Sequence, residues 1–360
     1  MSKRFGYVLV AALALSGCTV GETAGTGAAN DPAFASEPKL ETSQEQLDAG
    51  LHCLPFTHPD KPPVLLVHGT FTAGREQYEW NYLPLLAARG FDVCAVTYPD
   101  RGFGDQQISA EYVVNALRRI QAQTGRKIGL IGHSQGVSVP RWALKWWPSA
   151  RNAVADFVML AGPNQGTVIA DPTALVNTLL GTLGLPGLPI NGNASVPLLP
   201  EALRQFPSQS QFMQATNRGD QSPGDIDYTA IYTLTDELVQ PALPLPVPAA
   251  SLEYGVDNPK IRNILLQDIC PLQIVDHVTI GTVDAVAFAL AIDAISQPGP
   301  ADPARAGGSA ICNPLPIIVD PVLASAGAQA LLNILQSEVS NGVPALHLVA
   351  AEPPLKDYAK

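Results

Sequence analysis

The sequence predicts an α/β fold with a mostly parallel central sheet and helices on both of its faces. Short, nearly continuous apolar runs recur along the chain, and helical patterns separate them. Strands that are apolar throughout are typical of a parallel sheet that is buried on both sides, and alternation with helices is typical of α/β proteins. The predicted strands cover residues 64–67, 93–96, 128–131, 157–160 and 230–232.

One of the helices between these strands can be predicted in detail. Val113, Leu117 and Ile120 recur at spacings of four and three residues, which places them on one face of a helix. Ser109 suits the N-cap of this helix, and Gly125 suits its C-terminal stop. We therefore expect a helix between Ser109 and Gly125.

The composition limits the kinds of partner that the protein can have. The 360 residues include 21 Lys and Arg against 32 Asp and Glu, and the formal net charge is −11 at pH 7. Because the basic residues form no cluster, we expect no nucleic acid partner, whereas neutral esters and lipids stay open. No internal repeat or long linker divides the chain, so we expect one folded domain over residues 46–360 that acts as a monomer.

The N-terminal residues have the pattern of an export signal. A basic start at residues 3–4 precedes an apolar run over residues 7–15, which is too short to span a bilayer comfortably. Small residues then lead into Cys18, as in the bacterial lipoprotein box, where cleavage before the cysteine is followed by lipidation of its thiol. An ordinary secretory signal with an incidental cysteine is the alternative. We expect a signal peptide over residues 1–17, a flexible tether over residues 18–45, and a protein that is lipid-anchored in the cell envelope or secreted.

The cysteines that remain if Cys18 is lipidated are even in number: Cys53, Cys94, Cys270 and Cys312. In an exported protein an even number predicts disulfides, and the sequence alone permits three pairings. No two of these cysteines have the close spacing of metal ligands, so we expect no metal site.

A short glycine-rich motif predicts the chemistry. Gly132-His133-Ser134-Gln135-Gly136 follows a predicted strand and precedes a helical stretch that ends at Pro148. This is the Gly-x-Ser-x-Gly pattern of a nucleophile elbow, in which small neighbours make room for a serine on a strained strand-to-helix turn. Glycine and serine often mark only a turn, but the strand before the motif and the helix after it favour Ser134 as a nucleophile.

Such a serine needs a base that accepts its proton. In folds with this elbow the chain order is serine, then an acid, then histidine. The histidines after Ser134 are His277 and His347. His277 is favoured because it follows an apolar run over residues 271–275, where a strand end or a loop can reach a cleft, whereas His347 has the pattern of a buried or edge residue.

The base in turn needs a carboxylate to orient it. Asp236 follows the strand-like residues 230–234 and so lies at the carboxyl end of a predicted strand, where α/β sheets build their sites. Glu237 is the near competitor. Asp276 adjoins His277, but neighbouring residues project in different directions, so it is a poor partner for the imidazole.

Two backbone donors are expected to stabilise an oxyanion. One is the N–H of Gln135, directly after the nucleophile, and the other is Thr70, in the loop after an early strand. The Thr70 hydroxyl can add a further hydrogen bond. His68, at the start of this loop, is interpreted as a packing or loop-orienting residue.

Several motifs in register resemble the serine lipases and esterases of the fungal lipase B family. The resemblance runs from residue 31 to residue 359, and its main stretches are residues 63–70, 134–136, 235–241, 275–277 and 312–316. It implies an α/β-hydrolase fold and a carboxylic ester hydrolase with a Ser134, Asp236 and His277 triad, an acyl-enzyme intermediate, and Thr70 and Gln135 as oxyanion donors. It also implies a Cys53–Cys94 and a Cys270–Cys312 disulfide, a lipid or small ester substrate, and no cofactor or metal.

The chain departs from this family beside the nucleophile. His133 stands where the family has a tryptophan in the pocket for the alcohol portion, so the shape of a pocket formed by His133, Leu238 and Val239 is open. Residues 175–199 suit a mobile flap and residues 322–339 a helix over the pocket mouth, with core packing as the alternative for both. Other functions stay open too: an acyltransferase or polyesterase with the same triad, or an envelope lipoprotein that keeps the fold without catalysis.

Mass spectrometry of the mature N-terminus tests the export prediction. We expect a chain that begins at Cys18 and carries lipid on the thiol. An unmodified N-terminus upstream or downstream of Cys18 would refute the anchor.

Overall fold

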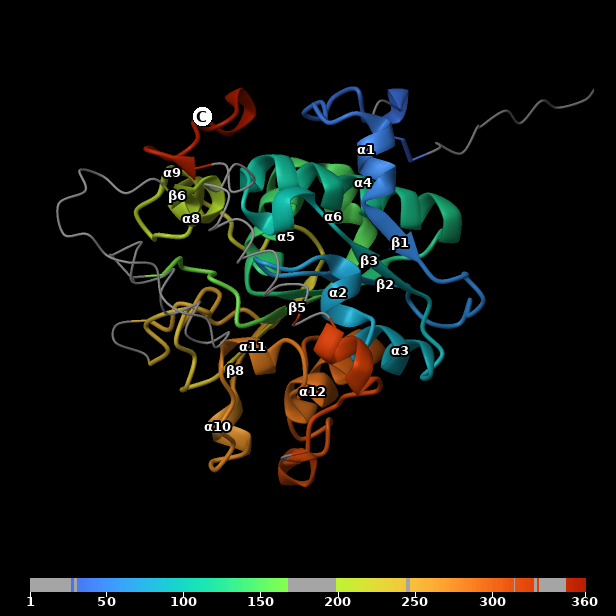
Figure 1. The fold of residues 1–360 in the computed structure, drawn as a ribbon, viewed down its shortest axis with the longest axis vertical. Helices are drawn as coiled ribbons and strands as arrows, with labels where there is room; N and C mark the ends of the chain where they lie inside the picture. Colours follow the sequence, from blue (N-terminus) through green and yellow to red (C-terminus); the bar gives the residue numbers. More distant parts are fainter. Residues whose placement is uncertain are drawn as a thin grey trace, which may run out of the picture.

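The computed structural model describes residues 27–28, 31–167, 199–243, 247–313, 315–326, 329 and 348–360. The signal peptide expected over residues 1–17 and Cys18 lie outside these residues. Within them, seven strands form one sheet in the order β1-β3-β2-β4-β5-β7-β8 (Figure 1). β1 (Leu51–Cys53) is antiparallel to β3 (Val93–Val96), and all other pairs are parallel: β2 (Val64–Val67), β4 (Ile128–His133), β5 (Val154–Leu160), β7 (Asp227–Tyr232) and β8 (Ile261–Leu265).

Helices cover both faces of this sheet, as the sequence predicted. Side chains alternate along β2, so that Leu65 and Val67 join one buried cluster while Val64 and Leu66 join the other. The first cluster is covered by α1 (Gln44–Ala49), α4 (Gln106–Thr124), α5 (Gln135–Trp146), α6 (Pro148–Ala153) and α9 (Gln211–Asn217). The opposite face carries α2 (Gly74–Tyr78), α3 (Tyr82–Ala87) and α12 (Ala285–Ser296) (Figure 1).

Shorter elements connect these layers. A second, two-stranded sheet pairs β6 with β9 in an antiparallel manner. The bounds of the short elements are η1 (Pro32–Phe34), η2 (Pro99–Gly102), β6 (Leu199–Pro200), α8 (Glu201–Gln205), α10 (Leu266–Ile269), α11 (His277–Ile280), η3 (Gly308–Ile311), β9 (Leu348–Val349) and η5 (Asp357–Ala359).

The helix predicted between Ser109 and Gly125 begins earlier than expected. Its N-cap is Asp105, whose carboxylate accepts a hydrogen bond from the backbone N–H of Gln107 at 2.9 Å, so the prediction of Ser109 as the cap was wrong. The first turn contains the buried polar residues Gln106 and Gln107, so the apolar periodicity that predicted the helix does not extend over it. The stop at Gly125 is confirmed, because this residue adopts the left-handed conformation with φ of 66°.

The folded domain also begins earlier than residue 46. Glu37 and Arg118 form an almost buried ion pair at 2.8 Å, and the Phe34 ring lies 3.9 Å from the Arg118 guanidinium. The indole N–H of Trp147 donates to the carbonyl oxygen of Pro38 at 2.8 Å. Within the tether expected over residues 18–45, residues 34–38 therefore make specific contacts with α4 and with Trp147.

Among the residues that the structure describes, one stretch is apolar and long enough to cross a membrane by length and composition. It runs from His277 to Ser296, and its most apolar part has a mean hydropathy of 1.8 and is 67% buried within the protein. The stretch comprises α11 (His277–Ile280) and α12, and the buried residues of α12 belong to the core on one face of the sheet.

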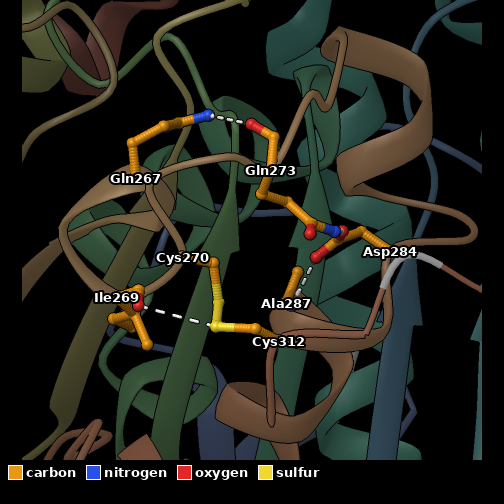
Figure 2. The surroundings of a disulfide bond; sticks show 7 residues. All are labelled: Gln267, Ile269, Cys270, Gln273, Asp284, Ala287 and Cys312. Atoms are coloured by element: carbon orange, nitrogen blue, oxygen red, sulfur yellow. Dashed lines mark hydrogen bonds between the residues drawn. A yellow bond between two sulfur atoms is a disulfide. The ribbon is translucent and has the colours of Figure 1, made fainter. Parts of the chain in front are cut away.

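Two disulfides join segments that are distant in the sequence. Cys53 of β1 is bonded to Cys94 of β3, and Cys270, directly after α10, is bonded to Cys312, directly after η3. Figure 2 shows the second disulfide beside Gln273, which donates to the Asp284 carboxylate at 2.7 Å. These are the pairs that the resemblance implied.

We expect the double variant Cys270→Ser/Cys312→Ser to lose about 2–4 kcal/mol in free energy of unfolding, because the bond closes a long loop in the unfolded chain. The bonded cysteines are 42 residues apart, and those of the other disulfide are 41 apart, so Cys53→Ser/Cys94→Ser is a matched comparison with a similar expected loss. Urea denaturation measures both. An unchanged unfolding midpoint in the first variant would contradict the prediction.

Candidate active site

Ser134 lies on a sharp turn between β4 and α5. It has φ of 55° and ψ of −123°, a backbone conformation that residues other than glycine rarely adopt. The glycines on either side permit it: a β-carbon at Gly132 would lie 1.8 Å from the carbonyl oxygen of Gly136, and one at Gly136 would lie 2.2 Å from that of Val67. The turn brings Ser134, partly exposed, to the carboxyl edge of the sheet.

The structure brings the three predicted triad residues together. Nε2 of His277 lies 2.8 Å from Oγ of Ser134, and Nδ1 of His277 lies 3.0 Å from each carboxylate oxygen of Asp236. His277 and Asp236 are buried. His347, the alternative base, lies outside the described residues.

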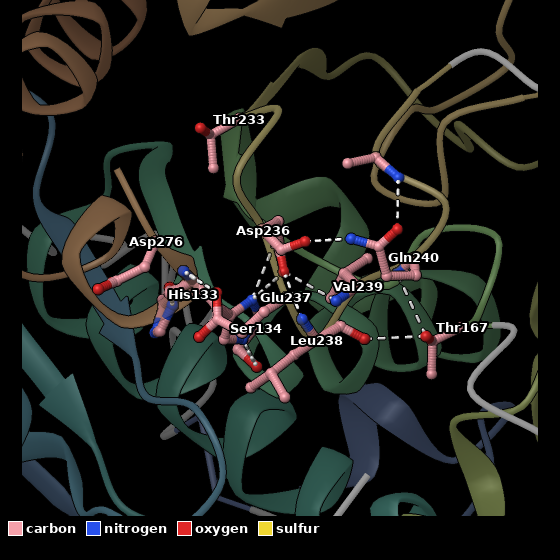
Figure 3. A network of polar contacts seen from close by, with 12 residues as sticks. His133, Ser134, Thr167, Thr233, Asp236, Glu237, Leu238, Val239, Gln240 and Asp276 are labelled. Atoms are coloured by element: carbon pink, nitrogen blue, oxygen red, sulfur yellow. Dashed lines mark hydrogen bonds and ion pairs between the residues drawn. The ribbon is translucent and has the colours of Figure 1, made fainter. Parts of the chain in front are cut away.

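Asp236 is held by the loop that follows β7. Its Oδ1 accepts hydrogen bonds from the backbone N–H groups of Leu238 at 2.9 Å and Val239 at 2.8 Å (Figure 3). The competing carboxylates contact other groups: Glu237 accepts the backbone N–H of His277 at 3.0 Å, and Asp276 accepts that of Thr279 at 2.7 Å as the N-cap of α11.

His277 is the first residue of the short helix α11, whereas the sequence suggested a position after a strand end or in a loop. Residues 271–275 form no strand. The loop that carries His277 is tied to the loop that carries Asp236, since the Thr235 hydroxyl donates to the carbonyl oxygen of Val275 at 2.6 Å. Gln267 adds a second link, because its side-chain amide donates to the Thr233 hydroxyl at 2.9 Å. The same amide donates to the backbone carbonyl oxygen of Gln273 at 3.0 Å (Figure 2).

The predicted oxyanion donors lie beside each other at the mouth of the site. The Thr70 hydroxyl donates to Oε1 of Gln135 at 2.8 Å, and the Gln135 amide donates to the carbonyl oxygen of Gly102 at 2.8 Å. Within the described part of the chain, no acceptor contacts the backbone N–H of Thr70 or of Gln135. The Thr70 hydroxyl is engaged with Gln135, which leaves the two backbone N–H groups as the candidate donors.

An ion pair that the sequence did not reveal fixes the loop after β2. Arg101 binds the Glu76 carboxylate through two nitrogens, one of them at 2.8 Å from Oε1. It also binds Phe71 reciprocally: the Phe71 N–H donates to the Arg101 carbonyl oxygen at 2.8 Å, and the Arg101 guanidinium donates to that of Phe71 at 3.2 Å. These contacts hold Phe71 at φ of 74°, directly after Thr70.

His68, before Thr70, lies buried against Tyr98 with ring centroids 3.9 Å apart, which agrees with a packing role.

A mostly apolar cavity of about 310 Å³ opens beside Ser134. The predicted pocket residues His133, Leu238 and Val239 all line it. Residues that the sequence did not single out also line it, among them Gln77, Trp80, Leu203 and Phe206. Of the two segments expected to frame the site, residues 175–198 lie outside the described residues, whereas residues 321–326 are helical and Ala324 lines the cavity.

Comparisons with known proteins identify the family of the chain. Residues 61–245 match the family model described as "Lipase (class 2)". The chain is also 30% identical over 293 residues to "Lipase B" of Pseudozyma antarctica, covering 80% of this chain and 75% of that protein. The chain belongs to the class 2 lipase family.

A solved structure supports the fold of this class 2 lipase. The crystal structure of lipase B from Aspergillus fumigatus superimposes with a TM-score of 0.73 at 29% sequence identity, covering 91% of this chain and 74% of that one. The α/β-hydrolase fold and the resemblance to the lipase B family are thereby confirmed. The homology supports a lipase-type hydrolase, and together with the disulfides it is consistent with secretion.

The two histidines beside Ser134 have opposite electrostatic surroundings. Burial alone would lower the pKa of His277, but the charge of Asp236 and its hydrogen bond outweigh burial and raise it above 6.5. For His133, burial and the neighbouring His277 lower the pKa to about 3.

Within the described residues of this class 2 lipase family member, no group of three or more His, Cys, Asp or Glu side chains is placed to hold a metal ion.

We expect an NMR titration to give the imidazole of His277 a pKa above the ordinary histidine value of 6.5. Ester hydrolysis should fall as pH decreases through this raised pKa, because the protonated ring cannot accept a proton. Asp236→Asn should lower this pKa. Asp276→Asn, which removes a carboxylate that does not contact the ring, should lower it less. A His277 pKa at or below 6.5 in the unaltered protein would contradict the prediction.

Proposed function

We propose that this class 2 lipase hydrolyses carboxylic esters of lipid type through an acyl-enzyme on Ser134. The observation that carries the proposal is a single imidazole, that of His277, placed between the Ser134 hydroxyl at 2.8 Å and the Asp236 carboxylate at 3.0 Å. A nucleophile, a base and an orienting acid in this geometry are the requirements for acyl transfer by a serine.

In the first half of the reaction, Oγ of Ser134 attacks the ester carbonyl carbon while Nε2 of neutral His277 accepts its proton. The carbonyl oxygen gains negative charge and accepts hydrogen bonds from the backbone N–H groups of Thr70 and Gln135. The imidazolium then donates its proton to the alcohol oxygen as the C–O bond breaks. The alcohol leaves, and the acyl group stays on Ser134.

In the second half, a water molecule attacks the acyl carbon and gives a proton to Nε2 of His277. The bond to Oγ breaks, the proton returns to Ser134, and the carboxylic acid leaves. Asp236 takes no proton. It holds the Nδ1–H of the imidazole, which keeps the Nε2 lone pair directed at Ser134 and stabilises the imidazolium.

The cavity supports lipid-type esters as substrates. Leu238 and Val239 line it next to the acid loop, and Trp80 and Phe206 add aromatic surface, so that a hydrocarbon chain would be removed from water there. The class 2 lipase family implies lipid esters as well. We include in the proposal that the protein acts as a monomer and is held at a membrane through lipidated Cys18.

Labelling with a fluorophosphonate, followed by peptide mapping, tests the nucleophile. The probe should form a covalent bond to Ser134 in the unaltered protein, and Ser134→Ala should abolish both labelling and hydrolysis. Ser208→Ala, which alters an exposed serine on the described surface, is the control and should keep both. Labelling that survives Ser134→Ala would refute the proposal.

The substrate class is tested on the same preparation. Hydrolysis rates on short-chain esters, long-chain triglycerides and a polyester film are measured side by side. Hydrolysis of the triglycerides is the expected outcome. Activity confined to short esters or to the film would leave the mechanism intact and replace the lipid-type substrate.

A further inference from the structure

His133 is buried between two segments that meet at the site. It is the last residue of β4, and 5% of its surface is exposed. Its Nδ1 lies 3.1 Å from the amide nitrogen of Gln77, and its Nε2 lies 2.8 Å from the carbonyl oxygen of His277. Its ring centroid is 5.2 Å from that of His277. His133 therefore contacts the backbone of the predicted base without contacting its imidazole nitrogens.

The hydrogen bonds around His133 can run in one direction only. Oε1 of Gln77 accepts the backbone N–H of Gly69 at 2.9 Å, which leaves the amide NH2 group of Gln77 facing His133. An amide NH2 group can only donate, so Nδ1 of His133 accepts. Nε2 must then carry the hydrogen, and it donates to the carbonyl oxygen of His277, which can only accept. The chain of hydrogen bonds begins at the backbone N–H of Gly69, which can only donate, and ends at the backbone carbonyl oxygen of His277, which can only accept. These two ends fix the orientation of the Gln77 amide and the tautomer of His133 between them.

The backbone approaches the ring closely on two sides, at positions where only glycine leaves room for it. A β-carbon at Gly281 would lie 2.0 Å from Cδ2 of His133, and one at Gly69 would lie 3.3 Å from its Nδ1. The backbone of Gln77 is held in turn by Asn81, whose side-chain amide donates to the Gln77 backbone carbonyl oxygen at 2.9 Å. The imidazole of His133 thus occupies a slot between the loop after β2 and the end of α11.

The neutral state of His133 agrees with these bonds. Burial lowers the pKa of its imidazole to about 3, so the ring stays uncharged at neutral pH. A protonated ring would direct a second N–H at the Gln77 amide, which is itself a donor.

We propose that His133 is a positioning residue that sets the distance between the loop carrying Gly69 and Thr70 and the backbone of His277. The chain of hydrogen bonds joins the residue before the oxyanion donor Thr70 to the residue that supplies the base. The proposal rests on the ester hydrolysis proposed above. Loss of the chain should misplace both groups relative to the substrate carbonyl, and small misplacements of this kind have large effects on the chemical step.

Kinetics of four variants test the proposal on a short-chain ester, for which the size of the cavity matters least. His133→Phe and Gln77→Met each break the chain, and we expect each to lower kcat about 10- to 100-fold with KM changed less than about 3-fold. The double variant should lose no more than the larger single loss, because both substitutions break one connected unit. His133→Gln should restore most of kcat, since its amide oxygen can accept from Gln77 and its amide nitrogen can donate to His277.

Three outcomes overturn the proposal. They are losses that add in the double variant, an equal loss for His133→Gln and His133→Phe, and wild-type kcat in both single variants. Fluorophosphonate labelling of Ser134 in the unaltered protein separates this result from the proposed function, because failure to label would contradict ester hydrolysis itself.

A measurement on the unaltered protein keeps the proposal testable if the variants fail to fold. Nitrogen NMR of the histidine rings should show Nδ1 of His133 without a proton and Nε2 with one at neutral pH. The opposite tautomer, or a charged ring, would contradict the hydrogen-bond directions on which the proposal depends.

Discussion

The close approach of the turn after β4 to the end of β2 is the constraint on which the site depends. With glycine at position 136, the backbone at the start of α5 lies against the carbonyl oxygen of Val67, and no side chain fits between them. This contact places Ser134 at the sheet edge. It also places the backbone of Gln135 beside the loop after β2, where the Thr70 hydroxyl contacts the Gln135 side chain. The strained backbone at Ser134 persists because the packing around it allows no alternative.

The rest of the site is built by tying loops to one another. The loop that carries Asp236 is joined to the segment that carries His277 by two hydrogen bonds. One runs from the Thr235 hydroxyl to the carbonyl oxygen of Val275, and the other from the N–H of His277 to the Glu237 carboxylate. Arg101 and Glu76 hold the loop after β2 from the other side. Polar groups that are already oriented before a substrate arrives need little rearrangement during a reaction, which is the general basis of electrostatic stabilisation in enzymes.

The sequence predicted the parts of this arrangement that have a local pattern. Apolar runs located the buried strands β2, β3, β4, β5 and β7, and the elbow motif located the turn at Ser134. The short edge strand β1 and the strand β8 were not predicted. β8 contains Arg262 and Asn263 and is only partly buried, so it lacks an apolar run. Edge strands carry a weak signal because one side of their backbone and much of their surface meet solvent.

Long-range side-chain contacts had no signal in the sequence. Gln77 and His133 are 56 positions apart, and Glu76 and Arg101 are 25 apart, so no spacing rule relates them. Polar residues misled the prediction in the same way. The buried Gln106 and Gln107 gave no apolar signal for the first turn of α4, and the partly buried Glu37 gave none for the start of the packed chain. Such contacts become visible only when the fold has brought the elements together.

The ends of the described sheet also bear on how this protein avoids association with its own copies. A strand at the edge of a sheet exposes unpaired backbone groups, which other chains can pair with. β1 is three residues long, and its Cys53 is bonded to the directly opposite Cys94, so it cannot peel away and expose the longer β3. At the other edge, β8 presents the charged and exposed Arg262. A covalent bond at one edge and a charge at the other are devices that disfavour the addition of a further strand to an exposed sheet edge.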